Sequence, residues 1–510
     1  MSEEFTLEER AALAPYVTNL DSPVFALRNL PEEVVAVLFA YYSRSRESLR
    51  RNLLRLLADG DLDLAATGDV TQEVQSGDHL QAARDKAKTF HEKWVVGYGH
   101  ASVAEHGCVH LALEGVSIIA SKLVEDTRLA SYTEKSTRYV AFDTGHLYTP
   151  PSIASDPDLS RTYSETVASL LDAYSEWTED FVVQIKAITP RTEKQTERGY
   201  DNACRATAFD QLRYLLPAAV HTNIGLTINA RALETLISKL LSQPLPEGRE
   251  LGERIKEEAA HIVPTLLKYA DYSNYRSETS RAIGSLAGAF LTGAPEVEPA
   301  SVRVTWSDAD GDDHLLAGIL YEKSSVSLDS LLTQVRSWSP DVREQVVDEY
   351  LSRRGKHDAP GRALERVFCT AEIVMDYGAY RDVQRHRMAT QALQPLTPNL
   401  GYETPPFVEQ FGYKERYDAL MGRSAAAFCE IARVDPDAAA YVLPLATRVR
   451  ALFTWNLRSI THFIELRSAR QGHPSYRRTA QQLYTEIERV YPLVARYLRP
   501  NMRSYSLTRD

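Results

Sequence analysis

Apolar residues recur at helical spacing along most of the chain, and Pro or Gly marks the breaks between these segments. The segment 30–60 has apolar positions at i, i+3 and i+4 and stops at Asp59-Gly60, so it predicts one amphipathic helix. The same periodicity predicts helix in three further segments, 99–132, 161–188 and 228–248. The pattern therefore favours an α+β fold that is mostly helical.

The region around residue 300 departs from this pattern. The stretch 292–301, TGAPEVEPAS, is rich in Pro and predicts a linker, which puts a domain boundary near residue 295. The stretch 301–325 has two alternating or β-branched runs around an Asp-Gly pair, so it predicts a β-hairpin. Its aspartates are spaced like a calcium loop, but the Gly at loop position six and the Glu at position twelve are missing. A polar turn is the better interpretation.

Two distant segments look like distorted copies of each other: RLASYTEKSTRYV at 128–140 and QRHRMATQALQPLTP at 384–398. Later in each half, a Leu-Pro pair precedes Asn-x-Arg by the same interval. The matched positions lie 259 apart for Arg128 and Arg387 and for Ser131 and Thr390, and 227 apart for Pro217 and Pro444 and for Asn229 and Asn456. Landmarks repeated in the same order indicate an internal duplication. The predicted domains are 1–295 and 296–510.

Composition restricts the class of protein. With 44% hydrophobic and 25% charged residues, the chain is typical of soluble globular proteins. The net charge of −11 argues against non-specific nucleic-acid binding. The four cysteines lack metal-ligand spacing and fit a reducing compartment, so we expect no metal site and a cytoplasmic protein. The N-terminus lacks signal-peptide features, and its most apolar stretch is too short to span a membrane.

Candidate chemistry in the first half lies in three places. The run GYGHASVAEH contains His100, Ser102 and Glu105, whose short spacing would let them face one pocket, although such a His is usually structural. The segment 128–140 contains Ser and Arg donors suited to phosphate, or alternatively forms a helix end followed by a polar loop. Arg213 lies beside apolar residues and needs an anionic partner if it is buried.

In the second half, Arg385, His386 and Arg387 are consecutive. On a helix they would point in different directions and would clamp an extended ligand such as a dinucleotide, although such a run is usually a solvated turn. In the run NLRSITHFIELR, Arg458 and His462 share a helix face, with Asn456 and Arg467 at its two ends.

Taken together, GH-x-S-x-x-EH, RHR, S-x-R-Y, R-x-x-LP and N-x-R resemble the flavin-dependent thymidylate synthases. The chain resembles two tandem copies of that family over most of residues 25–485. The resemblance implies mixed α/β domains that assemble as homotetramers with sites shared between subunits. It also implies FAD as cofactor, with NADPH and methylenetetrahydrofolate as co-substrates for the conversion of dUMP to dTMP, without a protein nucleophile. The protein would bind and orient the reactants.

Each copy keeps motifs that the other has lost. The first copy keeps the Glu-x-Ser-x-Arg segment and the Arg before Leu-Pro, whereas the second keeps RHR and the late His and Arg. The resemblance implies that the halves form a pseudo-dimer with one composite site. Its dUMP-binding residues would be Glu134, Ser136, Arg138, Arg213, Arg385 and Arg467, with Arg467 also catalytic; its FAD-binding residues would be His100, Ser102, Glu105, Arg385, His386, Arg387, Asn456, Arg458 and His462.

Two departures from the family pattern bear on activity. Asp382 stands where the family commonly has Gln, and an acid beside a phosphate is unfavourable unless it is turned away. The second copy has GKHDAPGR in place of the GH-x-S-x-x-EH element, which would weaken flavin binding. Three interpretations follow: an active thymidylate synthase, an inactive flavin- or nucleotide-binding paralogue with a regulatory role, and a scaffold. In each case we expect a homodimer that mimics the family's tetramer.

Overall fold

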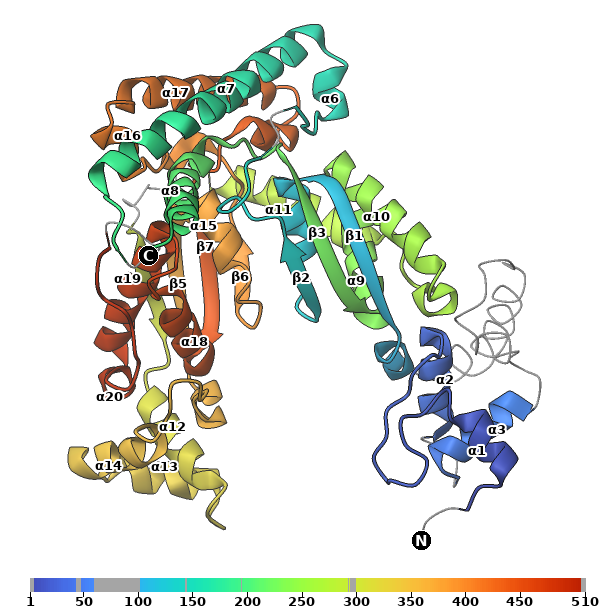
Figure 1. The fold of residues 1–510 in the computed structure, drawn as a ribbon. Helices are drawn as coiled ribbons and strands as arrows, with labels where there is room; N and C mark the ends of the chain where they lie inside the picture. Colours follow the sequence, from blue (N-terminus) through green and yellow to red (C-terminus); the bar gives the residue numbers. More distant parts are fainter. Residues whose placement is uncertain are drawn as a thin grey trace. The chain divides into compact units, whose positions relative to one another are not determined.

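The computed structural model describes residues 4–42, 47–58, 101–142, 145–193, 195–291, 293 and 300–505. Helices dominate these residues, and the strands form two small sheets (Figure 1). The predicted α+β, mostly helical class is confirmed. His100, predicted to contact FAD, lies outside the described residues.

The chain divides into two compact units. The first comprises Met1–Glu114, Leu129–Glu134 and Asn223–Thr292, and the second comprises Gly115–Arg128, Lys135–Thr222 and Gly293–Asp510. The second unit therefore combines the second sequence copy with a long segment of the first copy.

The two sheets have the same strand order. One sheet has the order β1-β3-β2, and the other has β5-β7-β6 with β4 added beside β5. In the first, β2 runs antiparallel to β3 with Ser131 opposite Thr227; in the second, β7 runs antiparallel to both β5 and β6. The strands are β1 (Cys108–Ser117), β2 (Ala130–Glu134), β3 (His221–Asn229), β4 (Val302–Ser307), β5 (Phe368–Asp376), β6 (Thr390–Leu393) and β7 (Arg448–Asn456).

Helix caps repeat between the copies as well. Asn229 accepts a hydrogen bond from the Ala232 amide at the start of α9 (Ala230–Leu241), as Asn456 does from Ser459 at the start of α18 (Leu457–Arg467). Ser117 caps α5 (Ile118–Glu125) and Asp376 caps α15 (Tyr377–Val383) in the same way. The asparagines of the two Asn-x-Arg motifs therefore cap equivalent helices in the two copies.

Within the second unit, a hydrogen-bonded seam joins the two Leu-Pro segments. Pro217 lies opposite Pro444 in an antiparallel bridge. The Ala218 amide donates to the Leu443 carbonyl, and the Leu445 amide donates to the Leu216 carbonyl, at 2.8 and 2.9 Å. Because each bond has its counterpart with the copies exchanged, the seam has the reciprocal form of a two-fold interface.

A pair of long helices packs beside this seam. Helices α7 (Pro157–Ile188) and α17 (Lys414–Ile431) lie side by side in Figure 1. The buried Trp177 and Phe181 of α7 pack against Tyr413 with tilted rings, whose centroids lie 4.7 and 5.3 Å from that of Tyr413. The predicted helix 161–188, ending at Thr189, is confirmed within α7.

Three predictions of local structure are wrong. The segment 99–132 is not one helix, because its apolar positions alternate through β1. From residue 101 onward, only α5 is helical apart from the 3₁₀ turn at Ala101–Glu105. The predicted hairpin at 301–325 is β4 followed by helix α12 (Gly311–Tyr321), since β5 supplies the partner for β4. The predicted helix 30–60 is α2 (Glu32–Tyr42) and α3 (Leu49–Ala58), because the Ser48 hydroxyl accepts from the Arg51 amide and starts α3 anew.

The remaining helices lie between these elements in the chain. They are α1 (Leu7–Leu13), α6 (Pro151–Ala154), α8 (Glu197–Leu212), α10 (Pro246–Ala260), α11 (Asn274–Phe290), α13 (Leu328–Arg336), α14 (Pro340–Leu351), α16 (Pro406–Gln410), α19 (Pro474–Val490) and α20 (Pro492–Ala495). Among the described helices, none has the length and apolar character needed to cross a membrane.

Candidate active site

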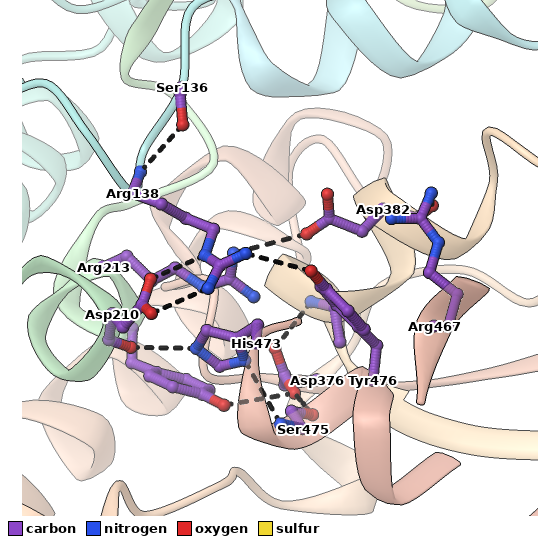
Figure 2. Close-up of polar contacts among 12 residues, drawn as sticks. Ser136, Arg138, Asp210, Arg213, Asp376, Asp382, Arg467, His473, Ser475 and Tyr476 are labelled. Atoms are coloured by element: carbon purple, nitrogen blue, oxygen red, sulfur yellow. Dashed lines mark hydrogen bonds and ion pairs between the residues drawn. The ribbon is translucent and has the colours of Figure 1, made fainter. Parts of the chain in front are cut away.

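Charged residues from both sequence copies meet inside the second unit (Figure 2). Arg138 follows β2 in the chain, and Arg213 is the C-cap residue of α8. From the second copy come Asp382 on α15 and Arg467 at the end of α18. We call Arg138, Arg213 and Arg467 the arginine cluster.

Arg138 is held by a bidentate ion pair. Its Nε and Nη2 donate to the two carboxylate oxygens of Asp210 at 2.6 and 2.8 Å, and its Nη1 donates to the Tyr476 hydroxyl at 2.9 Å. Burial acts to lower the pKa of Arg138, but the bonds to Asp210 outweigh burial and raise it. Arg138 is therefore a fixed positive charge whose direction is set by Asp210 and by Tyr476 of the other copy.

Arg213 is buried with two of its donors unsatisfied. The residue is 1% exposed. Its Nη1 lies 3.4 Å from Asp382 Oδ2, whereas Nε and Nη2 have no hydrogen-bond acceptor within the described part of the chain. A buried guanidinium with unused N–H groups is costly, so this geometry indicates a place for an anion.

Asp382 faces the arginine cluster instead of turning away from it. Burial acts to raise the pKa of Asp382, but the charge of Arg213, followed by those of Arg467, Arg138 and Arg385, outweighs burial and lowers it. The carboxylate therefore stays ionised among the arginines. Because this carboxylate is not turned away, its negative charge would oppose any phosphate that binds here.

Arg467 connects to the RHR segment. Its Nε donates to His386 Nε2 at 2.9 Å, and its Nη2 donates to the Asp382 carbonyl at 2.7 Å. Its guanidinium also lies over the Tyr476 ring, 5.2 Å from the centroid. Burial, followed by the charge of Arg467, holds the pKa of His386 well below its usual range, so the ring is a neutral acceptor.

A buried polar layer lies beneath these arginines. The Ser475 amide donates to His473 Nδ1 at 3.2 Å, so Nε2 carries the proton and donates to the Asp210 carbonyl at 2.9 Å. The Ser475 hydroxyl and the Ala379 amide both donate to the buried Asp376 carboxylate. This layer fixes the positions of α8, α15 and α19 around the cluster.

Ser136 and Glu134 occupy different surroundings. The Ser136 hydroxyl accepts a hydrogen bond from the Arg138 amide at 3.2 Å, so it shapes the turn that carries Arg138. Glu134 is buried at the end of β2, in the first unit.

The residues expected to contact FAD are found in both units. The RHR residues lie in the turn between α15 and β6, and not on a helix. Arg385 is exposed there, and Arg387 Nε donates to the Arg128 carbonyl at 3.3 Å. The His462 ring lies 5.5 Å from that of His386.

Two of the other residues expected to contact FAD are already engaged within the protein. The Asn456 side chain caps α18, and Arg458 Nη1 donates to Glu365 at 2.9 Å. In the first unit, Ser102 lies in the 3₁₀ turn at Ala101–Glu105, and Glu105 pairs with Arg231 as Glu365 does with Arg458.

Sequence reasoning missed Asp210, His473, Ser475 and Tyr476. Asp210 precedes Arg213 by one helical turn on α8, which is the one spacing that signals a shared surface. His473 and Tyr476 gave no signal because their partners are far away in the sequence. Among the described residues, no group of His, Cys, Asp or Glu is arranged to hold a metal ion.

Comparison with known proteins gives the family. The profile of the thymidylate synthase complementing protein family matches two separate segments, residues 52–265 and 304–493. The chain therefore belongs to this family, and the two matches confirm its tandem duplication. The resemblance to the flavin-dependent thymidylate synthases is confirmed as well.

Individual relatives are of two kinds. A UPF0159 protein of Chlamydia pneumoniae is 34% identical over 96% of this chain and 94% of its own length. A flavin-dependent thymidylate synthase of Clostridium tetani is 28% identical over 34% of this chain and 68% of its own length. A solved Helicobacter pylori flavin-dependent thymidylate synthase, complexed with FAD and dUMP, matches 39% of this chain and 99% of its own at 16% identity and a TM-score of 0.30.

Proposed function

We propose that this chain is an FAD-dependent thymidylate synthase that methylates dUMP to dTMP with methylenetetrahydrofolate and NADPH, using one composite site. The observation that carries the proposal is the meeting of Arg138 and Arg213 of the first copy with Arg467 of the second. These are the residues that each copy kept. Random loss of motifs in two copies would not preserve residues that lie around one point.

The arginine cluster has the charge and the donors needed to bind the phosphate of a nucleoside monophosphate. The buried Arg213 has two N–H groups available for phosphate oxygens, and guanidinium groups match phosphate geometry. Arg467, fixed by His386 and by the Asp382 carbonyl, would stabilise negative charge that develops on the uracil ring. Ser136 would act through the turn that positions Arg138.

Within the second unit, the residues that would hold FAD are those of the RHR turn. An exposed Arg385 beside the half-buried Arg387 provides the positive charge that a flavin pyrophosphate requires. When bound, the flavin would supply the redox chemistry, with NADPH as the source of electrons. This chain would bind and orient dUMP and hold the neutral His386 against Arg467.

The test is anaerobic NADPH oxidation that depends on dUMP, together with detection of dTMP, in the presence of methylenetetrahydrofolate. Ser136→Ala and Arg467→Ala should lose dUMP binding or turnover, whereas Arg161→Ala, which removes an exposed ion pair with Asp158, should match the wild type. Normal dTMP synthesis by both site variants would refute the composite site. One FAD per chain, measured by absorbance of the purified protein, would support a single site.

A second candidate is a flavin- or nucleotide-binding paralogue without turnover. Asp382 favours this alternative, because its carboxylate faces the position proposed for the phosphate. Binding of dUMP without any dUMP-dependent NADPH oxidation would identify this case.

A further inference from the structure

The arginines of the arginine cluster differ in how closely each is paired with a carboxylate. Arg138 is matched by the full carboxylate of Asp210, at 2.6 and 2.8 Å. Arg213 has only a long contact of 3.4 Å to Asp382, although it is the most deeply buried of the three arginines. The Asp382 side chain retains 21% exposure, so it reaches Arg213 from the accessible side.

Three observations together define a site for one anionic group. Arg213 Nε and Nη2 are buried without an acceptor in the described part of the chain. A Cβ atom added at Gly378 would lie 3.4 Å from each of these two nitrogens and 3.1 Å from Asp376 Oδ1, so the glycine lets the backbone of α15 lie close to the guanidinium. The Asp382 carboxylate already lies within hydrogen-bonding distance of this guanidinium, whose charge also acts on the buried Asp376 carboxylate.

From this geometry we propose that Asp382 is a built-in anion that holds the place of the nucleotide's phosphate, so that a phosphate must displace it from Arg213. The inference rests on the proposed nucleotide site but concerns its selectivity. In the resting protein the carboxylate keeps the buried guanidinium paired. When a phosphate monoester binds, the like charge of the carboxylate opposes it.

The consequence is weak discrimination between a nucleotide and its nucleoside. An arginine site without an internal acid would bind dUMP far more tightly than deoxyuridine, because only the former has a phosphate. With Asp382 in place, much of that difference is cancelled. Affinity for the base and sugar is unaffected, since Asp382 acts only at the phosphate end.

The experiment measures dissociation constants for dUMP, deoxyuridine and inorganic phosphate by isothermal titration calorimetry. It compares the wild type with Asp382→Asn, Asp382→Ser and the exposed control Asp158→Asn. In the neutral site variants, dUMP and inorganic phosphate should bind at least tenfold more tightly, with deoxyuridine unchanged. The control should behave as the wild type.

A second readout distinguishes displacement from a merely structural role. Without ligand, Asp382→Asn should unfold at a lower temperature, because Arg213 loses its ionised partner; with saturating phosphate it should gain more thermal stability than the wild type does. Two neutral variants are used so that poor folding of one does not prevent the measurement.

Unchanged or weaker phosphate binding in the folded neutral variants would overturn the proposal, even if the wild type makes dTMP. Conversely, tighter binding of inorganic phosphate in a protein without thymidylate synthase activity would support the proposal and refute the proposed function.

Discussion

Breaking the ion pair between Arg138 and Asp210 should strongly destabilise the second unit. In Asp210→Asn the carboxylate becomes a neutral amide of the same shape. The side chains of Arg138 and Asp210 are only 10% and 2% exposed, so water cannot replace the lost partner. Removing one member of a buried ion pair costs about 3–5 kcal/mol, because the other charge stays buried. The amide oxygen of the new Asn can still accept one hydrogen bond from Arg138, so we expect a cost of about 3 kcal/mol, at the lower end of this range.

The assay is urea unfolding followed by tryptophan fluorescence. Trp177 and Trp455 are buried in the second unit and report on its unfolding. The matched control is Glu176→Gln, because Glu176 also receives two hydrogen bonds from one guanidinium, that of Arg416, but both side chains are more than half exposed. Its effect should be far smaller. Equal destabilisation by the two substitutions would refute the reasoning from burial.

Three further outcomes are expected from the same unit. Burial, followed by the charges of nearby arginines, holds the pKa of His473 well below its usual range, so the unfolded chain binds the extra proton below pH ~6.5. The free energy of unfolding should therefore fall as the pH drops below that value, by up to about 1.4 kcal/mol per pH unit for this group. Urea titrations at pH 5.5–7.5 should show a smaller dependence of the free energy of unfolding on pH for His473→Gln than for the wild type. An unchanged dependence on pH would contradict this. Gly378→Ala should weaken dUMP binding in calorimetry, because its Cβ would lie 3.1 Å from Asp376 Oδ1 and close to Arg213. The control Gly422→Ala on α17 places no Cβ within 4 Å of another part of the chain and should leave dUMP binding unchanged. Equal affinities for dUMP in the two variants would contradict this prediction. In the Asp382→Asn background, Arg213→Lys should lower the affinity for dUMP at least tenfold and leave that for deoxyuridine unchanged, because an ammonium cannot reproduce the fork of donors. Unchanged dUMP affinity would argue against Arg213 as a phosphate ligand.

The sequence predicted the fold class and the duplication because both depend on patterns that repeat along the chain. The Leu-Pro and Asn-x-Arg landmarks correspond to the seam and to the caps of α9 and α18. Local periodicity failed in segment 99–132, where pairing within a sheet decided the structure. A strand partner that lies far away in sequence cannot be inferred from the segment itself.

The candidate site was predicted in part for the same reason. Arg138, Arg213 and Arg467 were identified because each belongs to a retained motif. Asp210 and Tyr476 were missed because what distinguishes them is the contact with Arg138, which exists only after folding. The orientation of Asp382 toward the arginines likewise depends on how α15 packs, and not on its neighbours in the chain.

The reciprocal seam at Pro217 and Pro444 has a consequence for how such a site can change over generations. In an assembly of identical subunits, every substitution appears on both sides of a two-fold axis, so a change that helps one role must be tolerated in the other. Here the copies are covalently joined, and their pairing does not depend on the concentration of the protein. Each side of the seam can therefore mutate alone, which permits one copy to have Asp382 while its counterpart has Leu123 at the matching position.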